Sequence, residues 1–130
     1  MAALQRMHRN LDPVFDLYKQ EVAKTANYTV LPGDNGNLFT NAGASAAIVF
    51  TLPALGPLYK FGFIVIAGQN VSIASAAGDD IVTFNDAAAD QISFETSNEL
   101  IGGYVELFTN QAADKWYVRR FSNNTITVTS

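Results

Sequence analysis

The sequence predicts an all-β fold, a β-sandwich or barrel, preceded by an N-terminal arm that contains a short helix. After about residue 25, short segments rich in β-branched and aromatic residues alternate with turn residues such as Gly, Pro, Asn and Asp. Before that point the apolar residues follow a helical spacing instead. With 130 residues, the chain is long enough for one domain. We therefore divide it into an arm at residues 1–25 and a β domain at residues 26–130.

The arm contains one segment with a helical pattern, residues 13–24. Asp12 can cap the N-terminus of this segment, and Pro13 suits the first helical position because an N–H would be unpaired there anyway. An apolar stripe at helical spacing follows, formed by Val14, Leu17, Tyr18 and Val22. We expect a short amphipathic helix, since Pro13 interrupts any continuous rod from upstream.

The β domain contains nine or ten short segments at close and regular spacing, which is typical of a β-sandwich or barrel. The expected strands are residues 27–31, 37–40, 47–52, 59–67, 71–74, 81–84, 91–95, 104–109, 116–121 and 125–129. Near the C-terminus, Trp116 and Val118 are expected on one face of a strand, with Tyr117, Arg119 and Phe121 on the other. No repeat of 20 to 50 residues is visible, which argues against a solenoid or a propeller.

Charge and composition exclude several classes of function. Charged residues make up 15% of the chain, against about 25% in typical domains, so other copies or a partner are expected to cover part of its surface. The net charge is −4 and the excess of acids lies outside the arm, so we expect no nucleic-acid partner. The most apolar run, residues 61–67, is far shorter than the ~20 residues of a membrane helix, and we expect no membrane partner. Without a secretory signal, the chain is expected to stay in the cytoplasm until assembly or lysis.

Residues suited to catalysis or metal binding are few. The chain has no cysteine, and its one histidine, His8, lies in the arm and away from any expected cleft. Paired carboxylates could bind calcium or act as a glycosidase acid and base, and the candidates are Asp79, Asp80, Asp86 and Asp90 with Glu95 and Glu99 nearby. Their spacing matches no calcium loop, and the first pair runs directly into a strand. We interpret residues 78–80 as a turn and residues 85–90 as a solvated loop, and expect no catalysis, metal or cofactor.

Three aromatic residues could form a platform on which a sugar stacks: Tyr104, Trp116 and Tyr117. Because they lie in alternating strands, contact with the core or with another subunit is the favoured interpretation. The run at residues 61–67 is apolar on both faces, which indicates a central strand or a subunit contact.

The order of several short motifs resembles that in small structural proteins of tailed-bacteriophage virions, among them the head decoration (cement) proteins. The motifs span most of the chain and are Gly36-x-Leu38-Phe39-Thr40-Asn41-x-Gly43-Ala44, Phe50-Thr51-Leu52-Pro53, Tyr59-x-Phe61, Gly78-Asp79-x-Ile81, Gly103-x-Val105-x-Leu107 and Trp116-x-Val118. The resemblance implies a jelly-roll-like sandwich that forms a homotrimer on the virion surface. The absence of a fibre shaft and the presence of an arm favour the capsid surface.

The resemblance implies a protein that binds the major capsid protein on the outside of the head and stabilises it without catalysis. We expect the arm to contact the capsid through Leu4, Met7, Leu11, Phe15 and Tyr18. We expect contacts between the copies of the trimer at Phe61, Phe63, Tyr104 and Tyr117. The alternative function is a receptor- or carbohydrate-binding module of a tail or fibre tip.

Overall fold

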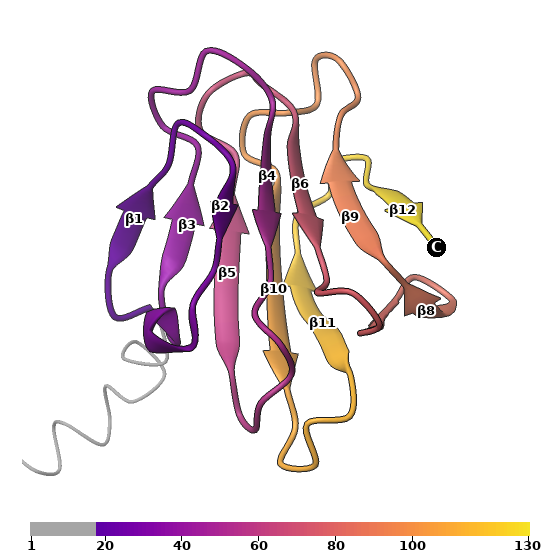
Figure 1. The fold of residues 1–130 in the computed structure, drawn as a ribbon. Helices are drawn as coiled ribbons and strands as arrows, with labels where there is room; N and C mark the ends of the chain where they lie inside the picture. The colour runs from indigo at the N-terminus through magenta and orange to yellow at the C-terminus, as the bar shows by residue number, and fades with distance from the viewer. Residues whose placement is uncertain (1–17) are drawn as a thin grey trace, which may run out of the picture.

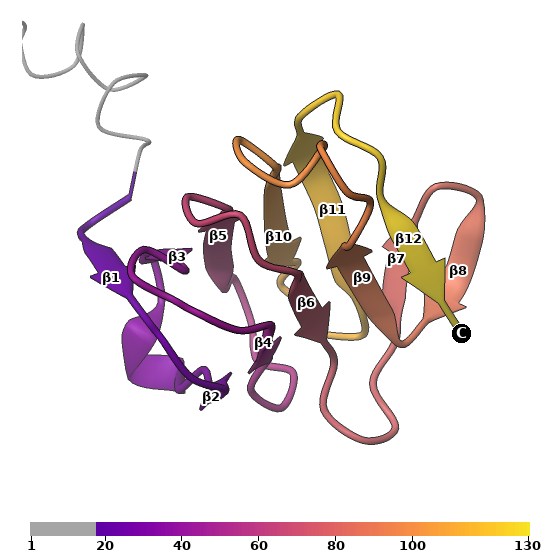
Figure 2. The same ribbon diagram turned by 90° about the horizontal axis from the view of Figure 1, so that it is seen from above.

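A computed structural model describes residues 18–130 as two packed β-sheets (Figures 1 and 2). Sheet A has seven strands in the order β1 (Glu21–Ala23), β3 (Leu38–Thr40), β5 (Lys60–Ile64), β10 (Tyr104–Thr109), β11 (Trp116–Phe121), β7 (Ile81–Thr83) and β8 (Asp86–Ala89). Sheet B has five strands in the order β12 (Thr127–Thr129), β9 (Gln91–Phe94), β6 (Val71–Ala74), β4 (Ile48–Thr51) and β2 (Tyr28–Thr29). One 3-10 turn, η1 (Pro32–Asp34), links β2 to β3. The prediction of an all-β fold is confirmed.

The core lies between the two sheets, where alternate side chains of the strands point inward. Phe39 of sheet A lies 5.5 Å, centroid to centroid, from Phe50 of sheet B, and Phe50 lies 5.2 Å from Phe63. Trp116 extends this aromatic layer, 5.9 Å from the ring of Phe61, and is fully buried. Offset and tilted aromatic contacts at these distances stabilise the core by more than the burial of apolar surface alone.

The first six strands wind as a coil. They alternate between sheet A and sheet B, so that β1, β3 and β5 pair in parallel on one side and β2, β4 and β6 on the other. Corresponding residues are 24 positions apart in β3 and β5, where Leu38 lies opposite Gly62, and 23 apart in β4 and β6, where Ile48 lies opposite Val71. The sequence has no visible repeat, and on that basis we expect no solenoid. This expectation is wrong for β1 to β6, where successive coils have similar geometry although their sequences do not repeat.

The second half of the chain closes the two sheets with antiparallel strands. β9 pairs antiparallel with β6 and β12, and β10 lies antiparallel between β5 and β11. Among the strand pairs of residues 18–130, five are parallel and five are antiparallel. A jelly roll is built from antiparallel Greek keys, so this mixed pairing does not confirm the jelly-roll detail of the expected fold.

The motif at residues 36–44 has a structural role at the end of β3. The Asn41 side chain is buried; its Oδ1 accepts hydrogen bonds from the N–H groups of Ile66 (2.7 Å) and Ala67 (2.9 Å), and its Nδ2 donates to the Ala67 carbonyl (3.0 Å). Gly43 has a φ of +83°, a conformation that other residues rarely adopt. The motif thus joins two successive coils of sheet A.

Two strands were not expected from the sequence. The helix predicted for residues 13–24 is wrong at its end, because Glu21–Ala23 forms β1 and pairs with β3; residues 13–17 lie outside the described chain. The loop predicted for residues 85–90 contains β8, which pairs with β7 across a two-residue turn. Both central residues of that turn, Phe84 (φ +41°) and Asn85 (φ +69°), have the positive φ values that tight hairpins require.

Candidate functional site

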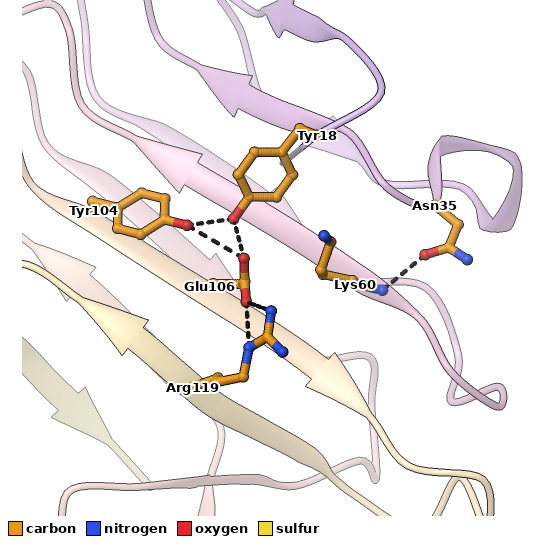
Figure 3. A network of polar contacts seen from close by, with 6 residues as sticks. All are labelled: Tyr18, Asn35, Lys60, Tyr104, Glu106 and Arg119. Carbon is orange, nitrogen blue, oxygen red and sulfur yellow. Dashed lines mark hydrogen bonds and ion pairs between the residues drawn. The ribbon is translucent and has the colours of Figure 1, made fainter. Parts of the chain in front are cut away.

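Glu106 is a carboxylate that the fold buries on the outer face of sheet A, with 1% of its surface exposed. It lies on β10 directly opposite Gly62 of β5. A Cβ at position 62 would stand 2.3 Å from the Tyr18 ring, so the glycine leaves the space that this ring occupies. Figure 3 shows the Tyr18 hydroxyl pointing from above β5 toward Glu106. Residues far apart in the sequence are thereby joined on one face.

Both oxygens of the Glu106 carboxylate accept hydrogen bonds from other side chains of the domain. The Tyr18 hydroxyl donates to Oε2 over 2.6 Å, and Nε of Arg119 donates to Oε1 over 2.6 Å (Figure 3). Nη2 of Arg119 also lies 2.5 Å from Oε1 and forms an ion pair. The Tyr104 hydroxyl bonds to that of Tyr18 and lies 3.4 Å from Oε2. These four residues, named the Glu106 cluster below, form charge-assisted contacts of the stronger kind.

A β-bulge presents Arg119 to this carboxylate. Glu106 lies opposite Arg120 and the next residue, Leu107, lies opposite Val118, so Arg119 is the extra residue of β11. Bulges of this type change the direction of side chains locally. The bulge also reverses the alternation beyond it: Tyr117 lies opposite Phe108 on the outer face, whereas Phe121 lies opposite the inward-facing Val105. The expectation that Tyr117 and Phe121 share a face is therefore wrong.

The two phenols of the cluster keep their protons. Burial, followed by the hydrogen bond to Glu106, raises the pKa of Tyr18 far above its usual value. Burial also raises the pKa of Tyr104, although its hydrogen bond with Tyr18 acts in the opposite direction. Lys60 lies nearby, with its Nζ 5.2 Å from the centre of the Tyr18 ring and its backbone N–H donating to Oδ1 of Asn35 (Figure 3). The Tyr18 hydroxyl therefore keeps its proton and remains a hydrogen-bond donor to Glu106. This contact attaches Tyr18 to β5 and β10.

Beside the cluster, two stacked rings form an aromatic strip on the outer face of sheet A. The rings of Phe108 and Tyr117 lie 5.6 Å apart with an interplanar angle of 30°, and both residues are half-buried. The guanidinium carbon of Arg119 lies 5.8 Å from the centre of the Phe108 ring. An aromatic surface with a cation beside it can stack against a flat or ring-shaped ligand.

An open hollow of about 400 Å³ lies at the other side of the Glu106 cluster. It is lined by Tyr18, Gln20, Glu21, Leu38 and Tyr104. The hollow, the cluster and the aromatic strip thus occupy one continuous region of the outer face of sheet A, on β1, β3, β10 and β11.

The four residues expected at subunit contacts lie in two different places, two in the core and two on the outer face of sheet A. Phe61 and Phe63 are 0% and 1% exposed and contact the aromatic core, which corrects their expected role between copies. Tyr104 and Tyr117 lie on the outer face of sheet A and are half-buried. Trp116, considered for sugar stacking, is fully buried and has no ring face to offer a ligand.

Of the residues expected to contact the capsid, Tyr18 lies within the described chain. Its hydroxyl forms hydrogen bonds with Glu106 and Tyr104, so Tyr18 already contacts the domain of its own chain. The other four, Leu4, Met7, Leu11 and Phe15, lie outside the described residues, as does His8.

Among the acidic residues of positions 79–90, Asp79, Asp80 and Asp86 have separate partners. Oδ2 of Asp79 accepts the Leu55 N–H over 3.2 Å, and Asp80 lies 3.5 Å from Nζ of Lys115. Asp86 accepts the Ala88 N–H over 2.9 Å and a hydrogen bond from the Ser130 hydroxyl. Within residues 18–130, no three His, Cys, Asp or Glu side chains gather as they would to hold a metal ion.

Sequence patterns did not identify Gly62 or the burial of Glu106. Glu106 stands at a polar position of an alternating strand, which predicts an exposed carboxylate. The one local signal was a glycine inside an apolar strand, a feature that often marks the close approach of another group.

No family model matches this chain, and no curated protein matches it. Among the described residues, no helix is long and apolar enough to cross a membrane.

Proposed function

We propose that the chain is a capsid decoration protein of a tailed bacteriophage. It is made in the host cytoplasm, forms a homotrimer, and binds the outer surface of the head through the major capsid protein. Its role is to stabilise the shell, and it catalyses no reaction. The sequence motifs at residues 36–44, 50–53 and 103–107 carry the resemblance on which the proposal is based.

The observation that supports this function best is the anchoring of Tyr18 by the Glu106 cluster. Tyr18 donates to a buried carboxylate and lies over Gly62, so the N-terminal segment joins the domain at a fixed point on sheet A. A segment that starts from a fixed point loses less conformational entropy on binding than one that starts from a mobile hinge. Three such segments on one trimer would bind a capsid with strong avidity, even if each contact were weak.

Removal of residues 1–17 tests the role of the arm. This truncation keeps Tyr18 and β1, so the domain should unfold at the same temperature as the full chain. We expect the truncated protein to lose binding to heads of its own phage in a co-sedimentation assay. A second variant, with Leu4, Met7 and Leu11 replaced by Ser, should reproduce the loss at full length. Unchanged binding by both variants would exclude the proposed arm contact.

The aromatic strip favours a second candidate, a receptor- or carbohydrate-binding module of a tail appendage. Phe108 and Tyr117 offer stacked, half-buried rings beside Arg119, as a sugar-binding surface would require. For this function, Tyr117→Ala should remove binding on a glycan array. Phe121→Ala is a matched control, because Phe121 is 52% exposed and contacts Phe84 rather than the strip. Equal glycan binding by both variants would exclude the strip as the site.

A further inference from the structure

The outer face of sheet B consists of uncharged side chains, most of them small and half-buried, and one of them, Ser93, 1% exposed. Alternation along the strands points Val49 and Thr51 of β4, Ser72 and Ala74 of β6, and Gln91 and Ser93 of β9 away from the core. In β12, Thr127 pairs with Ser93 and Thr129 pairs with Gln91, so both threonines continue the same face. Figure 1 looks onto this sheet, and no other strand or helix is drawn in front of β4 and β6. These outward residues are named the neutral face below.

The neutral face contains no charge, although the other sheet is charged. None of the strand residues of sheet B is Asp, Glu, Lys or Arg, whereas the strands of sheet A contain Glu21, Lys60, Asp86, Glu106, Arg119 and Arg120. A solvent-exposed surface usually has about 25–35% charged residues. Charged residues are depleted in the same way at the centres of protein interfaces.

Three polar side chains of the neutral face, Ser72, Gln91 and Ser93, bond to one another within the sheet. The hydroxyls of Ser72 and Ser93 lie 3.0 Å apart and share a hydrogen bond, and Nε2 of Gln91 donates to Oγ of Ser93 over 2.9 Å. Covering a polar group is costly when its hydrogen bonds to water are lost without replacement. Because these groups bond to one another, a second protein surface can cover them at a lower cost.

Given the self-association in the proposed function, charge indicates the face on which two copies can meet. Each chain has a net charge of −4, so two copies repel each other, and like charges placed opposite one another in an interface cost several kcal/mol. The neutral face is a surface on which the identical copies of the proposed trimer can meet without opposing like charges. Its small side chains also allow a flat sheet to approach closely.

We propose that the neutral face of sheet B is the surface through which copies of this chain associate. This inference rests on the self-association in the proposed function, and it replaces the earlier expectation of contacts at Phe61, Phe63, Tyr104 and Tyr117. It does not depend on binding to a capsid. The outer face of sheet A, with the Glu106 cluster and the aromatic strip, then remains free on each copy for another partner.

The test is the solution mass of the full-length chain, measured by light scattering over a range of concentrations. The wild type should have a mass above that of one 14.0 kDa chain, and three times that mass if it forms the proposed homotrimer. Ala74→Lys places a charge in the centre of the neutral face and should reduce the mass to 14.0 kDa. Ala23→Lys is the matched control, because Ala23 is an exposed alanine on β1 of sheet A, and it should assemble like the wild type.

Each result supports or overturns the inference. Val49→Lys charges the same face on β4 and should also give a monomer, which keeps the test valid if one variant fails to fold. Circular dichroism and the unfolding temperature identify a folded monomer. The inference is overturned if the wild type is a monomer at every concentration, or if folded lysine variants of the neutral face still assemble. Failure to bind phage heads by an assembled wild type would contradict the proposed function and leave this inference intact.

Discussion

The two sheets present opposite kinds of surface to solvent. The outer face of sheet A contains charges, half-buried aromatic rings and the carboxylate of Glu106, which is 1% exposed and bound by Arg119 and Tyr18. The outer face of sheet B contains neutral residues, among them Ser72 and Ser93, whose hydroxyls bond to each other. The inner faces, in contrast, share one aromatic core. The difference indicates that one outer face is specialised to fix and present the N-terminal segment and the other to meet an identical neighbour.

The largest expected effect is the loss of the charge of Glu106. Glu106→Gln keeps the shape of the side chain but weakens the hydrogen bonds from Arg119 and Tyr18, and we expect it to lower the free energy of unfolding by about 2–3 kcal/mol. Ser93→Ala on the neutral face removes a buried hydroxyl without a charge and should cost about 1 kcal/mol. Urea unfolding of both variants measures the difference. Equal losses would show that the two faces are stabilised alike.

A smaller effect is expected from filling the space above β5. A Cβ at position 62 would stand 2.3 Å from the Tyr18 ring, so Gly62→Ala should displace the ring and cost about 1–3 kcal/mol. In a Tyr18→Ala background the same glycine substitution should cost much less, because the ring it displaces is gone. The coupling free energy from this double-mutant cycle, obtained by urea unfolding, measures the contact directly. Additive effects would contradict the position of Tyr18 over Gly62.

The smallest effect depends on pH. The folded chain holds the Tyr18 proton more tightly than the unfolded chain, in which a tyrosine titrates near pH 10, because burial and Glu106 raise its folded pKa. The stabilising contribution is therefore complete below about pH 10 and is lost as the pH rises further. Tyr18→Phe should cost about 1 kcal/mol at neutral pH and should reduce this alkaline loss.

Unfolding by urea at neutral pH and above pH 10 gives this dependence. Tyr117→Phe serves as its control, because it removes a phenol of the aromatic strip outside the Glu106 cluster. An alkaline loss that is the same in Tyr18→Phe and in the wild type would contradict the role of this phenol.

Much of the sheet structure was predictable from local patterns. The pattern of short β-rich segments between turn residues located β6, β10 and β11 with their observed bounds, and the last two also alternate with the period of two that burial on one face produces. The pattern could not give β8, an Asp-Ala-Ala-Ala segment, since alanine is depleted in strands and this one depends on its pairing with β7. β1 is likewise a three-residue strand whose structure depends on pairing with β3 rather than on propensity.

The Glu106 cluster was not predictable, because its members come together only through the fold. Tyr18 and Glu106 are 88 residues apart, and the register of β5 and β10 places Gly62 between them. The bulge that presents Arg119 depends on how β11 pairs with β10. The neutral face could be inferred only after the strands were assigned to sheets, since its residues are separated along the chain by charged segments.

The most direct test of the account is the rate at which a thiol reagent labels each outer face. The natural chain has no cysteine, so Ala74→Cys and Ala23→Cys each place one thiol on a chosen sheet. If copies associate through sheet B, maleimide should label Ala74→Cys more slowly as the protein concentration rises, whereas the labelling rate of Ala23→Cys should stay constant. Labelling of Ala74→Cys at one rate across all concentrations, with an assembled protein, would contradict the division of roles between the two faces.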